Sequence, residues 1–252
     1  MITPTPQQTN FYTTSGEKYS VALKARAGTG KTYSLREWAN GAKGSGIATS
    51  FSSGTVAELV KRMSTKFPAK TMHAIGRQAI KASGRLKGVN KSKTFEIVND
   101  YYSQYEQDED LDRLLMGSIM KLISLAKTFG IKPGEKDGIY PDEPFIWEDL
   151  ADRFDLPFTP HLLHVARECL HVSNEKALKD GIIDFDDMLY ISLLWPHTFP
   201  RYGTIIADEV QDLNELQHLM LQRLLRPGGR IIAAGDDRQA IYAFRGALAD
   251  SY

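Results

Sequence analysis

Residues 20–32 read Ser-Val-Ala-Leu-Lys-Ala-Arg-Ala-Gly-Thr-Gly-Lys-Thr, and the fold prediction starts from this stretch. Its first part, Ser20 to Lys24, is a short apolar run of the kind that forms a parallel strand covered on both faces. Its second part, residues 25–32, matches the phosphate-binding pattern G-x-x-x-x-G-K-S/T, with Ala25 in place of the first glycine. A helical pattern follows from Tyr33 to Ala39. A strand, a glycine loop and a helix in this order place phosphates at a helix N-terminus, so the sequence predicts a nucleotide site.

The loop residues have the chemistry that ATP and Mg²⁺ require. Gly28 and Gly30 allow backbone N–H groups to curl around phosphate oxygens, which a Cβ would obstruct. Lys31 supplies positive charge to the β- and γ-phosphates, and the Thr32 hydroxyl supplies a ligand to Mg²⁺. We therefore expect ATP and Mg²⁺ as cofactors. The expected phosphate cradle is Ala27, Gly28, Thr29, Gly30, Lys31 and Thr32.

The second half of an ATPase site is expected at the end of another strand. The apolar run Thr204 to Ala207 leads directly into Asp208 and Glu209. The carboxyl ends of parallel strands form the edge of the sheet where α/β proteins bind ligands. We therefore predict that Asp208 holds Mg²⁺, partly through water, and that Glu209 polarises the attacking water. Two roles stay open for Asp212, because with Glu215 it has the spacing of a helix-capping box, and it could also be catalytic.

Apolar runs alternate with helical patterns, which indicates an α/β sheet with right-handed crossovers. The four runs are Ser20 to Lys24, Gly46 to Phe51, Thr204 to Ala207 and Arg230 to Ala234. Helices are expected over Thr55 to Met63 and Asn214 to Leu225. From about Gly88 to Lys179 no strand pattern is visible. The predicted fold is an α/β domain, a parallel sheet flanked by helices, formed by residues 1–87 and 180–252, with a mostly helical inserted subdomain at 88–179.

Composition bounds the class of protein. The 252 residues carry 31 basic and 31 acidic side chains and are 42% hydrophobic, which is ordinary for a globular protein. One cysteine, Cys169, excludes an intrachain disulfide framework. No run approaches the ~18 apolar residues of a membrane span, and Met1 to Gln8 lacks the pattern of a signal peptide. We therefore expect a cytoplasmic protein that does not act at a membrane.

Charge is segregated in the middle of the chain. Between Glu58 and Glu96 there is no acidic residue, and an acidic stretch from Asp100 to Asp112 follows. This pattern indicates a local basic surface, for which a solvated helical face and a contact with nucleic-acid phosphates are both open. The ten basic residues between the two glutamates are Lys61, Arg62, Lys66, Lys70, Arg77, Lys81, Arg85, Lys87, Lys91 and Lys93.

Seven segments, in order along the chain, resemble motifs of the superfamily 1A DNA helicases of the UvrD/Rep/PcrA group, in the N-terminal portion of those proteins. The segments are residues 5–8, similar to the adenine-reading glutamine motif; 25–32, the first motif with its leading alanine; 50–59, similar to T-F-T-N-x-x-A-x-E-M; 71–73, similar to T-x-H; 184–188, similar to D-F-D-D-L; 208–212, similar to D-E-x-Q-D; and 235–247, similar to G-D-x-x-Q-x-I-Y-x-W/F-R-G-A. The resemblance implies a P-loop NTPase domain of the RecA-like type that moves 3′→5′ on single-stranded DNA. Such helicases serve DNA repair or replication.

The resemblance also implies roles for single residues. Gln8 and Tyr33 would lie beside the adenine, although relatives often have arginine at the second position. Gln239 would sense the γ-phosphate and complete the catalytic set with Lys31, Asp208 and Glu209. The residues implied in the DNA path are Phe51, Ser53, His73, Phe244 and Arg245. Without the resemblance, the two phenylalanines would be interpreted as core aromatics.

Relatives of this kind have a second RecA-like lobe whose arginines complete the ATP site. We therefore expect residues 1–252 to be a monomeric fragment that binds single-stranded DNA and single/double-strand junctions but unwinds nothing alone. Two other functions stay open, namely the motor segment of a helicase–nuclease or recombination complex and a P-loop switch module that regulates a partner. Gln239 and Phe244 argue against the switch, because simple switches have no need of that segment.

Overall fold

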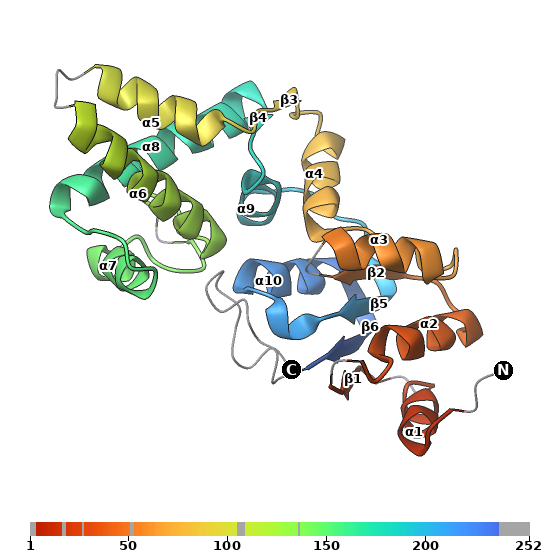
Figure 1. The fold of residues 1–252 in the computed structure, drawn as a ribbon. Coiled ribbons are helices and arrows are strands. Elements are labelled where there is room, and N and C mark those ends of the chain that lie inside the picture. Colours follow the sequence, from red (N-terminus) through yellow and green to blue (C-terminus); the bar gives the residue numbers. More distant parts are fainter. Residues whose placement is uncertain are drawn as a thin grey trace. The chain divides into compact units, whose positions relative to one another are not determined.

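The computed structural model of this chain describes residues 4–16, 19–26, 28–50, 53–104, 109–135 and 137–236. The chain divides into two compact units, of which the first contains Met1–Ile75 and Phe199–Tyr252 and the second contains Gly76–Thr198 (Figure 1). The second unit is wider than the predicted insertion at residues 88–179, because it includes most of α4 (Met72–Ala82) and all of α9 (Asp187–Leu194). These helices meet at Gly76, where an added Cβ would lie 1.9 Å from the Met188 carbonyl oxygen.

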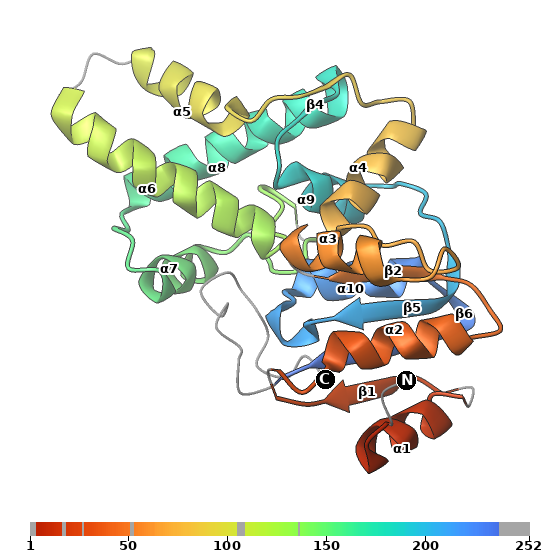
Figure 2. The same ribbon diagram turned by 45° about the vertical axis from the view of Figure 1, so that its right-hand side comes forward.

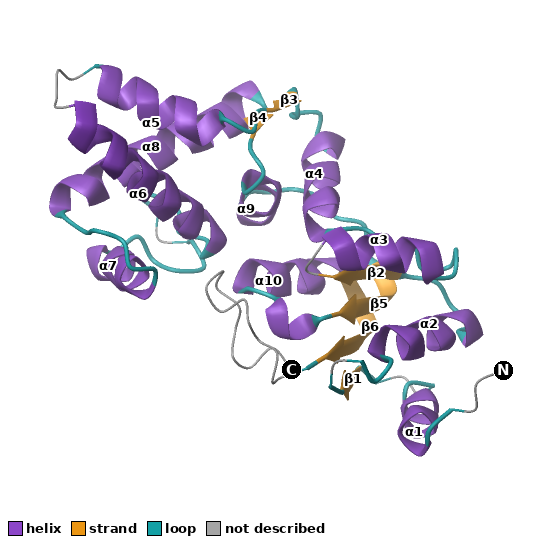
Figure 3. Ribbon diagram, viewed as in Figure 1, coloured by secondary structure: helices purple, strands orange, loops and turns teal. Residues whose placement is uncertain are grey.

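Four parallel strands form the sheet of the first unit in the order β1-β6-β5-β2 (Figure 3). They are β1 (Val21–Lys24), β2 (Ile47–Ser50), β5 (Tyr202–Asp208) and β6 (Leu225–Gly235). Each predicted apolar run forms one of these strands, so the predicted α/β fold with a parallel sheet is confirmed. β6 lies between β1, which leads into the phosphate loop, and β5, which ends at the acidic pair. The phosphate loop and the acidic pair, the two halves of the predicted nucleotide site, therefore follow strands that are separated only by β6.

Helices cover both faces of this sheet. α2 (Lys31–Gly41) and α10 (Glu215–Leu224) lie on opposite faces (Figure 2). The other helices of the unit are α1 (Pro6–Thr14) and α3 (Ser53–Arg62). On the α2 face, Leu35 and Trp38 pack in one buried cluster with Ile206 of β5. Burying an aliphatic side chain stabilises a fold by about 1.5–3 kcal/mol, so this cluster holds α2 firmly on the sheet.

The cap of α10 differs from the prediction. Asn214 is the N-cap, and its Oδ1 accepts a hydrogen bond of 2.9 Å from the Gln217 backbone N–H. The Gln217 side chain accepts one of 3.0 Å from the Asn214 N–H, which completes the capping box. The predicted box of Asp212 and Glu215 is wrong, because a 3₁₀ turn over Val210–Asp212 delays the start of the helix.

The second unit is mostly helical. Besides α4 and α9 its elements are β3 (Gly88–Val89), α5 (Lys93–Ser103), α6 (Glu109–Thr128), α7 (Pro144–Arg153), α8 (Pro160–Glu175), a π-helical turn (Lys176–Asp180) and β4 (Ile182–Ile183). α5, α6 and α8 pack against one another, and α7 packs on α6. The buried side chains of Val98, Ile123 and Leu170 contribute one residue from each of the three central helices. No described helix is both long and apolar enough to cross a membrane.

The second unit contains a two-stranded ladder that was not predicted from the sequence. β3 pairs in parallel with β4, where Gly88 is opposite Ile182 and Val89 is opposite Ile183. Gly181 precedes β4 with φ of +69°, and an added Cβ would lie 1.9 Å from the Arg85 carbonyl oxygen. Two residues are too few to show the period-2 alternation by which a strand is predicted.

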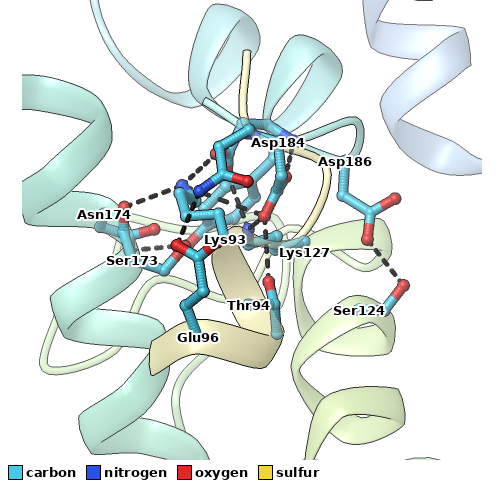
Figure 4. A network of polar contacts seen from close by, with 12 residues as sticks. Lys93, Thr94, Glu96, Ser124, Lys127, Ser173, Asn174, Asp184 and Asp186 are labelled. Atoms are coloured by element: carbon cyan, nitrogen blue, oxygen red, sulfur yellow. Dashed lines mark hydrogen bonds and ion pairs between the residues drawn. The ribbon is translucent and has the colours of Figure 1, made fainter. Parts of the chain in front are cut away.

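A buried ion network holds the helices of this unit to the segment that precedes α9 (Figure 4). Lys127 of α6 contacts Asp184 at 2.6 Å and Asp187 at 2.8 Å. Lys93 of α5 also contacts Asp187 and donates a hydrogen bond of 3.0 Å to the Ser173 carbonyl oxygen. The two aspartates accept hydrogen bonds from each other's backbone N–H groups, at 2.8 and 2.9 Å. Two lysines therefore face two carboxylates, and the four charges balance.

The network corrects one part of the predicted basic surface. Lys93 is 1% exposed and its amine is committed to the network, so it is not available to DNA. Burial would raise the pKa of Asp184, but the charges of Lys127 and Lys93 outweigh it and hold that pKa at about 2. The other nine basic residues of the run are exposed or half-exposed. The segment Asp184 to Met188, to which the motif resemblance assigns only the return of the chain to the sheet, supplies the acidic half of this network.

Candidate active site

The phosphate loop joins β1 to α2. Gly30 is the N-cap of α2 with φ of +87°, and Gly28 has φ of +74°. An added Cβ at Gly28 would meet nothing within 4 Å, so the backbone angle itself requires glycine in this structure. No side chain caps α2. Its first N–H groups therefore form the kind of helix N-terminus that binds phosphate.

Thr32 and Asp208, the predicted Mg²⁺ ligands, lie together. The Thr32 hydroxyl donates a hydrogen bond of 2.7 Å to Asp208 Oδ2, and the Glu209 backbone N–H donates one of 3.0 Å to Oδ1. Asp208 is fully buried at the end of β5, and burial raises its pKa to about 6. A hydroxyl beside a carboxylate offers the oxygen ligands that Mg²⁺ prefers.

Lys31 and Glu209, two of the predicted catalytic residues, also meet. The Lys31 amine lies 3.5 Å from Glu209 Oε2, and the lysine side chain is 6% exposed against 29% for the glutamate. Glu209 has φ of +54°, a left-handed backbone conformation that is uncommon outside glycine. Strained backbone of this kind costs about 1–3 kcal/mol and is concentrated at functional sites.

Gln211 was not predicted as a site residue, but it contacts the acidic pair. Its amide nitrogen donates hydrogen bonds to Glu209 Oε2 at 3.0 Å and to Asp212 Oδ2 at 3.2 Å. Its amide oxygen accepts one of 3.0 Å from the Asp236 backbone N–H, directly after β6. The only sequence signal is its spacing, two residues after the acidic pair. Gln211 thus joins the ends of two neighbouring strands.

Asp212 accepts one of the hydrogen bonds of Gln211 and does not cap α10. It is 7% exposed, and among the described residues its Oδ1 has no hydrogen-bond partner. Burial, followed by the nearby charge of Glu209, raises the pKa of Asp212 to about 6. A buried carboxylate oxygen without a partner suits a site that receives a further ligand.

Gln8 and Tyr33, predicted beside the adenine, flank the start of α2. The Gln8 amide nitrogen donates a hydrogen bond of 3.2 Å to the Ser34 hydroxyl, which brings α1 to α2. Tyr33 lies in the first turn of α2, and the Arg36 guanidinium lies 4.6 Å from the centre of its ring. The adenine side of the predicted site is therefore close to the phosphate loop.

The predicted DNA contacts are placed less completely. His73 is the second residue of α4, and burial lowers its pKa to about 4, so it is neutral near pH 7. Ser53 begins α3, at the carboxyl end of β2. Thr29, also predicted in the phosphate cradle, donates a hydrogen bond of 2.6 Å from its hydroxyl to the Arg26 carbonyl oxygen. Five predicted site residues lie outside the described part of the chain: Ala27, Phe51, Gln239, Phe244 and Arg245.

The sequence also matches a known protein family over almost its whole length. Residues 5–252 match the UvrD/REP helicase N-terminal domain. The chain belongs to this family. The resemblance inferred from the motifs is therefore confirmed.

Relatives with known names share parts of this domain. The chain is 34% identical over 79 residues to DNA helicase II of Escherichia coli, which covers 28% of this chain and 11% of that protein. It is 33% identical over 111 residues to an ATP-dependent helicase/nuclease subunit of Carboxydothermus hydrogenoformans, which covers 40% of this chain and 10% of that protein. It is 30% identical over 93 residues to the RecBCD enzyme subunit RecB of Mycolicibacterium smegmatis, and the matched segment covers 33% of this chain and 9% of that protein. The matched segments thus span only a small part of these relatives.

Proposed function

We propose that this chain is the ATP-binding part of a DNA helicase or translocase that moves along single-stranded DNA. The observation that carries the proposal is the meeting of two segments 176 residues apart. There the Thr32 hydroxyl lies 2.7 Å from Asp208, and the Lys31 amine lies 3.5 Å from Glu209. Phosphate-loop and acidic residues at this spacing are what ATP hydrolysis needs.

The residues present fit Mg²⁺ and ATP. An uncapped helix N-terminus faces the site, a buried amine lies beside it, and a hydroxyl–carboxylate pair offers oxygen ligands. Bound Mg²⁺ would neutralise part of the negative charge on the phosphates. Lys31 would bind the terminal phosphates, Asp208 and Thr32 would hold the metal, and Glu209 would orient the attacking water. Gln239 is proposed as the γ-phosphate sensor on its motif alone.

The DNA part of the proposal rests on charge and on the family. Nine basic side chains between Lys61 and Lys91 are exposed or half-exposed. Clustered basic groups release counterions from DNA when they bind its phosphates. The names of the relatives support action on DNA, because they are helicases or parts of helicase complexes. Single-strand preference, 3′→5′ movement and a second lobe that completes the site are parts of the proposal.

A second candidate is the motor segment of a helicase–nuclease complex. It is favoured by the names of two relatives, of which one is a helicase/nuclease subunit and the other is part of the RecBCD enzyme. The two candidates differ in the fate of the DNA. The intact protein, assayed on a labelled duplex with a single-stranded tail, would displace an intact strand in one case and shorten it in the other. The switch-module alternative predicts neither outcome.

Calorimetry tests the nucleotide site directly. Residues 1–252 should bind Mg·ATP, and Lys31→Ala should abolish most of the binding heat, because it removes the charge that faces the phosphates. Lys43→Ala is the matched control, since Lys43 is an exposed lysine beyond the end of α2. Equal heats from wild type and Lys31→Ala would refute the site.

A further inference from the structure

Gln8 is held at both ends of its amide, and this fixes which end faces which way. The Thr5 backbone N–H donates a hydrogen bond of 2.9 Å to Gln8 Oε1, while the Thr5 hydroxyl accepts one from the Gln8 N–H. A backbone N–H can only donate, so the atom that it contacts must be the amide oxygen. The amide nitrogen is therefore the end that contacts Ser34, at 3.2 Å.

The Ser34 hydroxyl is shared between the glutamine and the phosphate loop. It donates a hydrogen bond of 3.0 Å to the carbonyl oxygen of Gly30 and accepts one from the Gln8 amide. A hydroxyl has one hydrogen to donate, and here that hydrogen goes to the Gly30 carbonyl, so towards Gln8 the Ser34 hydroxyl can only accept. Ser34 is 2% exposed, which leaves little room for another arrangement.

The far end of α1 is anchored as well. The Ser15 carbonyl oxygen, just beyond the helix, accepts hydrogen bonds from the Trp38 indole at 3.2 Å and the Arg230 guanidinium at 2.8 Å. Trp38 is on α2 and Arg230 is on β6. With one anchor at each end, α1 cannot shift along α2 without breaking several hydrogen bonds. The Thr5 and Ser34 contacts together set the direction of the Gln8 amide, while the anchor at Ser15 sets the position of the helix.

We propose that Ser34 is a positioning residue that orients Gln8 for the purine base and links base recognition to the phosphate loop. This inference rests on the proposed ATP site and deepens it. Each end of the held amide keeps one free capacity, a lone pair on the oxygen and a hydrogen on the nitrogen. An amide presented in this way suits adenine, whose N6 donates and whose N7 accepts. Guanine has an acceptor, O6, in place of the donor and would meet the amide oxygen unfavourably.

The test compares ATP and GTP binding by calorimetry in residues 1–252. Wild type should prefer ATP, and Ser34→Ala should lower the ratio of ATP to GTP affinity by roughly tenfold, the effect of about one hydrogen bond. GTP affinity should stay close to the wild-type value. Ser34→Thr should restore the preference, because a helical threonine can keep the hydroxyl bond to the carbonyl four residues earlier. Thr9→Ala, which removes an exposed hydroxyl from α1, is the matched control.

The outcomes separate this inference from the proposed function. If wild type binds no nucleotide, both fail. If wild type binds ATP and GTP equally, or if Ser34→Ala leaves the ratio unchanged, the ATP site stands and the role of Ser34 is refuted. An equal loss of ATP and GTP affinity in Ser34→Ala also refutes it, because that result means general damage to the phosphate loop. Thermal melting of each variant shows whether it is folded.

Discussion

The side chain of Gln211 makes three hydrogen bonds, to Glu209, to Asp212 and to the backbone of Asp236. It is 3% exposed, so none of these bonds is readily replaced by water. Glu209 itself has only partial cover, at 29% exposure, and its backbone is in the left-handed region. The carboxylate that we propose as the water-orienting group therefore depends on Gln211 for its position.

Replacing Gln211 by alanine should uncouple hydrolysis from binding. Loss of the amide frees Glu209 but leaves Lys31, Thr32 and Asp208 in place. We expect the ATPase rate of the intact protein to fall by about 10- to 100-fold, as is usual when a group that positions a catalytic ligand is removed. ATP affinity should change little. Steady-state kinetics and calorimetry measure the two quantities. A Gln211→Ala enzyme with normal turnover would contradict the positioning role.

Glu209→Gln should abolish turnover of ATP and preserve its binding, and the same two measurements check this.

At the scale of the elements, the ion network joins α5 and α6 to the segment before α9. Lys127 is fully buried, and although burial alone would lower its pKa, Asp187 and Asp184 raise it to about 12. Burying four charges that balance one another costs less free energy than burying three that do not. Removing one lysine leaves two carboxylates with a single partner, which is costly in a medium of low polarity.

Lys127→Met should therefore destabilise the second unit by ~3–5 kcal/mol, the usual effect of removing one partner from a buried ion pair. Lys121→Met is the matched control on the same helix, because Lys121 is exposed. Its loss should cost less than about 1 kcal/mol. Urea unfolding, followed by circular dichroism, measures both variants. Similar midpoints for the two variants would show that the network contributes little to stability.

The same network sets the pH dependence of the second unit. The pKa of Asp184 is lowered to about 2 in the folded protein, against 3.8 for the free group. A lowered folded pKa stabilises the protein above the unfolded pKa, and the stabilisation is lost as pH falls from about 4 toward 2. Lys127 has the corresponding effect at high pH. Its raised pKa stabilises the folded protein below pH 10.5, and this stabilisation is lost as pH rises through about 12. Unfolding curves measured from pH 2 to pH 7 should show the acid limit in wild type, and Asp184→Asn should weaken that pH dependence.

At the scale of the whole molecule, the proposed nucleotide site lies within the first unit. Lys31, Thr32, Asp208 and Glu209 all come from the first unit. Arginines that approach the γ-phosphate from another domain are worth about 10³–10⁵ in rate in other P-loop enzymes. If a second lobe supplies them in this family, the chain alone binds nucleotide but turns it over slowly.

Residues 1–252 should therefore hydrolyse ATP barely above background and displace no strand, with or without single-stranded DNA. Weak binding of a single-stranded oligonucleotide should remain, and its affinity should fall steeply between about 50 and 200 mM salt, because basic side chains release counterions. Fluorescence anisotropy, a phosphate-release assay and a strand-displacement assay measure these properties. Robust DNA-stimulated turnover would show that the site is complete without another lobe.

The amino-acid sequence was enough to predict the four strands of the main sheet, the phosphate loop, the acidic pair and the family. A strand buried on both faces is an uninterrupted apolar run, and a phosphate loop needs glycine and lysine at fixed spacing, so both are visible locally. For Gly28 the structure adds a second reason for glycine, a positive φ, which the spacing of the loop residues does not reveal.

The contacts between residues far apart in the sequence became visible in the three-dimensional structure. Lys93 looked like one of ten surface charges, yet its partner Asp187 is 94 residues away in the sequence. The partners of Ser34 and Gln211 likewise come from α1 and from the residue after β6. Periodicity reports that a residue is buried on its own element but not what it is buried against. Partners of buried polar groups are set by packing between elements, which a single sequence does not display.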